Sequence, residues 1–366
     1  LSGGATRFSV RDQYPTLIAP GIPGPDGLEF FGLPFSPETT DSELWNPALF
    51  WESSLEWNAF WTLAGGIRLD GYRAEARDPI TPNGASDSDS VGQWSGAMSL
   101  FYQPEKDASF YITLSDTNAV EGSIAGGGIM LNANGVLNRD NLENRSRLLE
   151  VGWKQQFSDR GAWAITAFHQ TRKRTEIRGP RSDIRVQGVE LEGKWNGSDQ
   201  AFGFFNLTWN DGDYENSAPS QLGGRSVYDL YAPGYGPEGR GTGRGYDFSF
   251  TNQVPPGDYP IPGLSPWTAN VGMAWKQGRG LLPGFRFWAK YRDAQPGNLD
   301  EEFFLPEQWE FNAGLDYRVS GWQLHLDLLN VLDETLWRHN GGTFFNNQLV
   351  SRGAPARARL RIVKTF

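Results

Sequence analysis

The sequence has no cysteine, only three histidines, and no long hydrophobic run. The absence of cysteine excludes disulfide frameworks and thiolate metal sites. A transmembrane helix needs about 18 or more consecutive apolar residues, so a helical membrane span is excluded. A mean hydropathy of −0.51 does not exclude a membrane β-barrel, because each strand of a barrel shows apolar side chains on one face only.

Charge and composition narrow the class further. The 33 basic and 43 acidic residues give a net charge of −10 without a long basic block, so nucleic acid is not an expected partner. The 45 glycines and 23 prolines indicate many turns, and the sequence predicts an all-β fold. The 15 tryptophans and 12 tyrosines favour a membrane protein, since these rings gather at membrane–water interfaces.

Alternation of apolar and polar residues predicts how the strands are oriented. The segment WQLHLDL near the end of the chain places its leucines on one face and His325 and Asp327 on the other. The last segment places Arg357, Arg359 and Arg361 together on one face. An arginine that faces lipid at the bilayer midplane costs about 2–4 kcal/mol, so these five side chains are predicted to face a polar lumen.

The same treatment along the whole chain predicts an antiparallel transmembrane β-barrel with about fourteen strands. These strands lie near 1–11, 47–57, 59–76, 91–103, 107–117, 146–157, 162–177, 183–196, 201–214, 265–277, 284–293, 309–319, 322–328 and from 357 onwards. Short turns alternate with long loops at 12–46, 77–90, 119–143, 215–264, 296–306 and 333–354. Outer-membrane barrels show this alternation, with short periplasmic turns and longer extracellular loops. A soluble β-sandwich or propeller is the alternative, but no fixed repeat period is found.

Several segments resemble the barrel of TonB-dependent transporters. They are Trp61 to Tyr72 (WTLAGGIRLDGY), Leu148 to Phe157 (LLEVGWKQQF), Ala164 to His169 (AITAFH), Val186 to Trp195 (VQGVELEGKW), Leu326 to Glu334 (LDLLNVLDE) and Gly353 to Phe366 (GAPARARLRIVKTF). Their order and spacing cover nearly the whole chain.

The resemblance implies that residues 1–366 are a single, partial barrel domain, the C-terminal part of a barrel of about 22 strands with a plugged lumen. An N-terminal plug domain, the segment that binds TonB and about eight first strands would be missing. No signal peptide heads the chain and Leu1 is not an initiator methionine, so we expect a piece of a longer protein. The implied function is TonB-dependent uptake of a scarce solute, such as a ferric siderophore or another metal chelate or small molecule, across the bacterial outer membrane.

Substrate capture is expected in the glycine-rich loop at 215–264. Aromatic faces and guanidinium groups suit bulky, often anionic ligands. The loop supplies both through Tyr228, Tyr231, Tyr235, Tyr246, Arg225, Arg240 and Arg244. The alternative is an exterior loop whose tyrosines pack on neighbouring loops.

Membrane lipid is the other expected partner. A basic run from Arg172 to Arg185 falls at the predicted outer rim, where arginines suit the phosphates of lipopolysaccharide. A solvated rim is the alternative interpretation.

No catalytic or metal site is predicted. The sequence has no HExxH or GxSxG motif, and His169, His325 and His339 do not fall at metal-ligand spacing. We therefore expect neither an enzyme nor a bound cofactor. The main alternative function is a passive porin-type channel, for which the predicted strands would form a complete smaller barrel.

Overall fold

The structure is a computed structural model built almost entirely of β-strands. It describes residues 2–17, 29–30, 33–78, 84–120, 131, 136–137, 139–175, 181–217, 257–276, 282–297, 301, 304–339 and 350–365, with strands but not side chains described before residue 41. No helix within these ranges is long and apolar enough to cross a membrane.

Fourteen strands lie in chain order across one antiparallel sheet. They are β1 (Ser2–Leu17), β3 (Leu33–Glu56), β4 (Trp61–Arg77), β5 (Ser86–Glu105), β6 (Ala108–Ala119), β7 (Asn144–Phe157), β8 (Gly161–Thr175), β9 (Arg181–Asn196), β10 (Ala201–Ser217), β12 (Trp267–Trp275), β13 (Gly284–Arg292), β16 (Gln308–Val319), β17 (Trp322–Leu329) and β20 (Arg357–Lys364). Two short strands pair at the side, β2 (Glu29–Phe30) with β3 and β11 (Gly257–Pro260) with β10. The predicted all-β fold and its strand number are confirmed.

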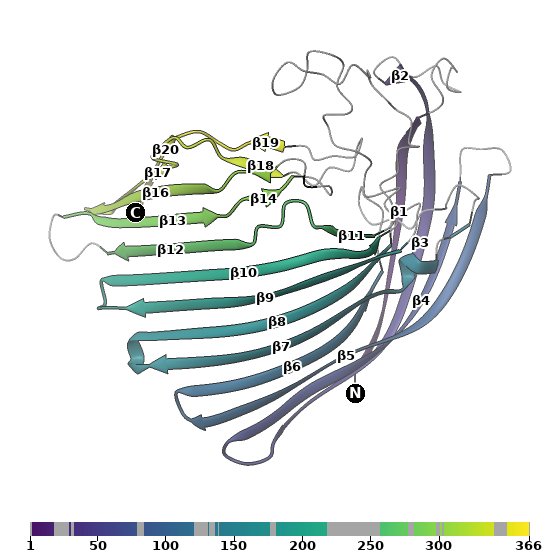
Figure 1. Cartoon of the computed structure of the whole chain (residues 1–366), viewed down its shortest axis with the longest axis horizontal. Helices are drawn as coiled ribbons and strands as arrows, with labels where there is room; N and C mark the ends of the chain where they lie inside the picture. Colours follow the sequence, from purple (N-terminus) through teal and green to yellow (C-terminus); the bar gives the residue numbers. More distant parts are fainter. Residues whose placement is uncertain are drawn as a thin grey trace.

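The sheet curls into an open trough (Figure 1). Strands β1 and β20 form its two edges, and the described residues of these edges are not hydrogen-bonded to each other. Short and long connections lie at opposite ends of the strands. Only Ser320 and Gly321 join β16 to β17, both with the positive φ that such a tight turn requires, whereas residues 120–143 separate β6 from β7.

Two predicted loops were too long. The loop at 77–90 already ends where β5 begins at Ser86, and the error is larger at 12–46. Residues 12–46 were expected to form a loop, but β1 continues to Leu17 and β3 begins at Leu33. Every residue of β1 pairs with β3, from Ser2 opposite Phe50 to Leu17 opposite Phe35. The start of β3 has the polar and proline-containing composition of a loop, so its pairing with the neighbouring strands overrides the local preference.

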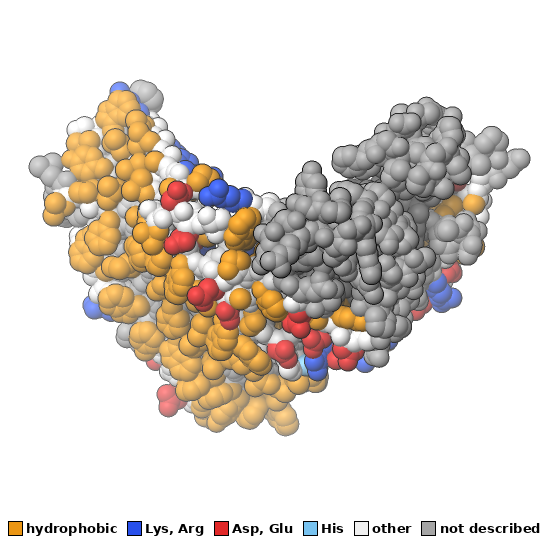
Figure 2. Space-filling view, turned by 45° about the horizontal axis from the view of Figure 1, so that its top comes forward, with side chains coloured by type: hydrophobic (Ala, Val, Ile, Leu, Met, Phe, Trp, Pro, Cys, Tyr) orange, Lys and Arg blue, Asp and Glu red, His pale blue; other side chains and the backbone are white. Residues whose placement is uncertain are grey.

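Apolar side chains are collected on one face of the sheet, which we call the outer face. Met98 lies opposite Leu114, and Leu114 lies opposite Leu149. These three side chains are 51%, 48% and 41% exposed, so they do not belong to a closed core. Figure 2 shows hydrophobic side chains spread over the convex side of the curved sheet. An apolar surface of this extent fits a lipid environment rather than water.

Aromatic rings follow the short-turn edge of the outer face. Ring centroids 4.5 to 6.5 Å apart link Trp61 with Tyr102, Tyr102 with Phe110, Phe110 with Trp153, Trp153 with Trp163, and Trp275 with Phe285. Such a row of amphipathic rings is typical of the membrane–water interface.

A second aromatic level lies toward the long connections. On β13 and β16, the rings of Tyr291 and Trp309 are 4.7 Å apart. On β12, Trp267 lies at the level near the long connections and Trp275 at the level near the short turns. The eight residue steps between them cover about 27 Å along the strand. At a tilt of about 40°, this becomes about 20 Å along the membrane normal, close to the apolar band of about 25 Å in outer-membrane barrels.

The long connections carry short strands that were predicted only as loop. β14 (Gln295–Pro296) pairs with β15 (Phe304–Leu305), and β18 (Trp337–His339) pairs with β19 (Val350–Arg352). Gly263 joins this rim, because its amide donates to the carbonyl of Pro296 at 2.8 Å. Its φ of 81° favours glycine, and an added Cβ would lie 3.0 Å from the His339 ring, so the ring packs directly on the glycine backbone.

We expect the packing of this rim to weaken in mild acid. Burial holds the pKa of His339 below its ordinary value, so the packed rim favours the neutral ring. When the rim opens, the His339 ring binds a proton more readily than in the packed rim. The contribution of this ring to the stability of the rim is therefore present above a pH of about 6.5 and is lost as the pH falls below it. Hydrogen exchange of the Gly263 and Trp337 amides, corrected for intrinsic rates, should show less protection at pH 5.5 than at pH 7.5. In His339→Gln this pH dependence should vanish, and its persistence would contradict the assignment.

Candidate functional site on the inner face of the sheet

The face opposite the apolar one, here called the inner face, is lined by polar side chains that satisfy one another across strands. The contacts are Ser99 with Thr113 (2.8 Å), Tyr111 with Thr166 (3.0 Å), Asn270 with Asn206 (2.8 Å) and Lys290 with Glu310 (4.0 Å). Three of these pairs lie directly opposite each other on neighbouring strands, where opposite residues share a face. Tyr111 and Thr166 meet across Gly152 of the strand between them. The inner face is therefore suited to water or to a polar partner.

A hollow of about 890 Å³ opens in the inner face at β3, β4 and β5. Small residues form its floor, among them Gly66 and Ala97, and Glu52 and Arg68 stand at its sides. Arg68 is held by Asp70 at 2.8 Å, whereas the exposed carboxylate of Glu52 makes no ion pair with the described residues. A molecule in this hollow would therefore meet a neutralised guanidinium at Arg68 and an unneutralised carboxylate at Glu52.

Part of the connection between β6 and β7 packs on the inner face closer to the long connections. Leu137 and Leu142 are buried in a cluster with Leu44, Tyr72 and other apolar residues of β3, β4 and β5. The amide of Leu137 also donates to Asp87 at 2.8 Å. Leu137 and Leu142 therefore cover part of the inner face of the wall.

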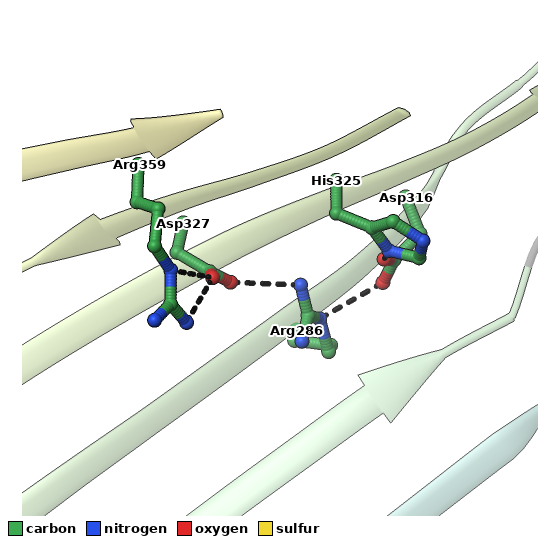
Figure 3. A network of polar contacts seen from close by, with 5 residues as sticks. All are labelled: Arg286, Asp316, His325, Asp327 and Arg359. Atoms are coloured by element: carbon green, nitrogen blue, oxygen red, sulfur yellow. Dashed lines mark hydrogen bonds and ion pairs between the residues drawn. The ribbon is translucent and has the colours of Figure 1, made fainter. Parts of the chain in front are cut away.

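An ion-pair network joins the last four strands of the sheet on the inner face (Figure 3). Asp327 on β17 accepts from Arg286 of β13 at 2.9 Å and from Arg359 of β20 at 2.8 Å. Arg286 also contacts Asp316 of β16 at 2.8 Å, and Nδ1 of His325 lies 2.5 Å from the same carboxylate. The two guanidinium groups and the two carboxylates of the network cancel in charge.

A glycine makes the longest reach in this network possible. Gly314 lies opposite both Arg286 and Asp327, so no side chain separates these two residues across β16. A Cβ at Gly314 would stand 2.9 Å from Nη2 of Arg286. The guanidinium therefore occupies the space that the glycine leaves open.

The structure brings together three of the five residues predicted to face the lumen. His325, Asp327 and Arg359 belong to the network, whereas the exposed Arg357 and Arg361 form no ion pair with the described residues. The sequence prediction missed the other members of the network, because their contacts depend on which strands pair and in which register. No group of three or more histidine, aspartate or glutamate side chains suited to a metal ion occurs in the described ranges.

The residues predicted to capture substrate lie outside the described part of the chain. They are Tyr228, Tyr231, Tyr235, Tyr246, Arg225, Arg240 and Arg244. In the sequence they fall between β10 and β11.

We expect Asp327 to stabilise the attachment of β20. Asp327→Asn removes the charge that holds two guanidinium groups, and hydrogen bonds to charged groups contribute about 1.5–3 kcal/mol. Because Arg359 is 73% exposed, solvent screening should reduce the loss to about 1–2 kcal/mol, around and below the lower end of this range. Urea unfolding in lipid vesicles, carried out on the protein that contains this chain, measures the loss. Arg361→Gln is the control and should change stability by less than about 0.5 kcal/mol; equal losses in both variants would contradict the role of the network.

Comparison with known proteins agrees with this geometry. Residues 2–331 match the family model described as TonB dependent receptor-like, beta-barrel. A search of curated protein sequences gives no match. Similar solved structures include the siderophore receptor PiuA from Acinetobacter baumannii, with 17% identity and a TM-score of 0.66 over 90% of this chain and 44% of that one. They also include the ferric yersiniabactin uptake receptor FyuA from Yersinia pestis (13%, 0.65, 98% and 49%) and the ferric-catecholate import receptor Fiu from E. coli K12 (16%, 0.63, 98% and 51%).

The chain thus spans about half the length of the structures it resembles. At these identities the structural likeness establishes the fold, and the family match covers most of the sequence. The family consists of receptors and transporters rather than enzymes, in agreement with the prediction of no enzymatic activity. The two-faced sheet and the match over residues 2–331 lead to one conclusion: the chain belongs to the TonB-dependent receptor family, whose β-barrels lie in the bacterial outer membrane.

Proposed function

We propose that the protein takes up a scarce solute, such as a ferric siderophore, across the outer membrane with energy supplied through TonB. The observation that carries this proposal is the family match over residues 2–331. The printed names of the similar structures add support for the substrate class, because PiuA, FyuA and Fiu are each named as receptors for siderophores or their iron complexes. A metal chelate is therefore the substrate class that we favour.

We propose that residues 1–366 are the C-terminal part of a larger barrel whose plug domain and first strands lie outside this sequence. The open trough supports this arrangement, because β1 and β20 leave backbone groups that a barrel in lipid must pair. A complete barrel of fourteen strands would pair these two edges with each other, and the described residues do not. A passive porin therefore has no observation in its favour.

Within this barrel, the inner face would contact the plug and the passing solute. Arg357, Arg359 and Arg361 supply exposed guanidinium groups to that space. Asp327 of the neighbouring strand binds Arg359, and His325 faces the same side. The tyrosines and arginines of the loop between β10 and β11 would make the first contact with the substrate from outside. Lipid and lipopolysaccharide would surround the apolar outer face.

We expect uptake to depend on TonB. The test uses the complete protein in cells that lack other receptors for the chosen ferric siderophore, with radioactive iron as the tracer. Uptake should be saturable and should fall to background when the gene for TonB is deleted, because a plugged barrel needs an energised partner to open.

The control in the same cells is a small sugar that crosses passive porins, whose entry should not change. Iron uptake that continues undiminished without TonB would contradict the proposal and would favour a passive channel.

A further inference from the structure

A hollow of about 550 Å³ lies on the outer face, at the upper limit of the apolar band. Ile67 and Asp116 flank Gly96 in register, and this glycine leaves a gap between them. Below the gap, Met98 and Leu114 form an apolar floor. The hollow is therefore apolar toward the middle of the membrane and polar toward the long connections.

Two arginines are fixed at the polar end of the hollow. Asp116 binds Nε of Arg145 and Nε of Arg147, each at 3.1 Å. The Arg145 guanidinium lies 4.7 Å from the centre of the Trp94 ring, and Nη2 donates to the Trp94 carbonyl at 3.4 Å. One carboxylate between two guanidinium groups leaves an excess positive charge at this point.

Arg147 is the group with donors to spare. Its side chain is 66% exposed, against 25% for Arg145, and its terminal nitrogens make no hydrogen bond or ion pair with the described residues. Thr171 lies directly opposite Arg147 and adds a hydroxyl to the same site. A guanidinium held through Nε, with Nη1 and Nη2 open, is arranged to bind two oxygens of a phosphate.

The described side chains of β9 and β10, further along the sheet, do not form such a site. Arg185 occupies the outer face there, but it is already bound to Asp213 at 2.5 Å and to Glu215 at 3.2 Å. Asp211 accepts from Gln187 beside it, so acidic groups exceed basic ones. A phosphate would be attracted to β6 and β7 and repelled from β9 and β10.

This distribution bears on the expectation that arginines of the basic run from Arg172 to Arg185 pair with lipopolysaccharide phosphates. Successive residues of a strand point to opposite faces. Arg172 lies opposite Ser146 and faces inward, whereas Arg185 faces outward and is neutralised. The side chains of Arg174, Arg178 and Arg181 lie outside the described residues.

We propose that this hollow binds the lipid A part of lipopolysaccharide, with a phosphate on Arg147 and an acyl chain on Ile67, Met98, Leu114 and Leu149. The long connections mark the extracellular end of the strands, so the site lies in the outer leaflet, where lipopolysaccharide is the main lipid. The inference rests on the outer-membrane location in the proposed function but not on TonB or on the transported solute.

The test measures lipopolysaccharide retained by the complete protein after purification in a mild detergent, by native mass spectrometry and by chemical assay of lipid A hydroxy fatty acids. Arg147→Gln should lower the retained amount about tenfold, since a charge-assisted pair is lost. Leu114→Trp should lower it as well, because the indole fills the apolar floor without changing the charge. Arg185→Gln is the matched control and should retain the wild-type amount.

Equal retention by Arg147→Gln and the wild type would overturn the proposal, and so would an equal loss in Arg185→Gln. A second experiment measures how strongly a lipid-soluble chemical label reacts with the hollow in the presence of lipopolysaccharide or of phosphatidylglycerol vesicles. If the two lipids protect the hollow from the label equally well, the assignment to lipid A is wrong. Siderophore uptake measured on the same variants separates the two proposals. If the proposed function is wrong, TonB-dependent uptake is absent while lipid retention still depends on Arg147. If the lipid site is wrong, retention is unchanged while uptake continues.

Discussion

A strand that crosses a bilayer must satisfy every backbone donor and acceptor through its neighbours, while its side chains meet lipid on one face and a polar space on the other. The rest of this structure depends on that constraint. It requires an antiparallel sheet in unbroken register, and fourteen strands provide one. It also fixes the chemistry of each position, because a shift of one residue would turn the arginines of β20 toward lipid.

The two faces manage their side chains in different ways. The outer face is apolar in its middle and carries aromatic rings near the short turns and near the long connections. This order matches the hydrocarbon core of a membrane between its two interfaces. The inner face is charged but largely neutralised, and glycines determine where its charges meet. At Gly314 the missing side chain lets Arg286 reach Asp327, and at Gly66 it leaves room for the hollow beside Glu52. A polar wall of this kind can contact a plug or a solute without exposing many unpaired charges.

The sequence allowed the fold and the faces of the strands to be predicted because alternation is a local property. Arg359, Asp327 and His325 could be assigned to one face from their own strands alone. That Arg286 and Asp316 are their partners could not be predicted, since this requires the register of four strands. The same limit explains the basic run near β8 and β9, where neighbours in sequence turned out to face opposite sides.

Loops were the other limit. The start of β3 has a loop-like composition, and only its pairing with β1 and β4 shows that it is a strand. The short strands of the rim were missed because two or three residues give no periodic pattern. The substrate residues expected between β10 and β11 stay a prediction, since a loop's composition does not determine its conformation.

Nitroxide labels placed one at a time along β12 test the two-faced sheet most directly, in the complete protein reconstituted into lipid vesicles. Collision with dissolved oxygen, which concentrates in lipid, should peak at Ala269, Val271 and Met273 and fall at Thr268, Asn270 and Ala274. A flat profile, or protection of all six positions as in a water-soluble core, would contradict the account.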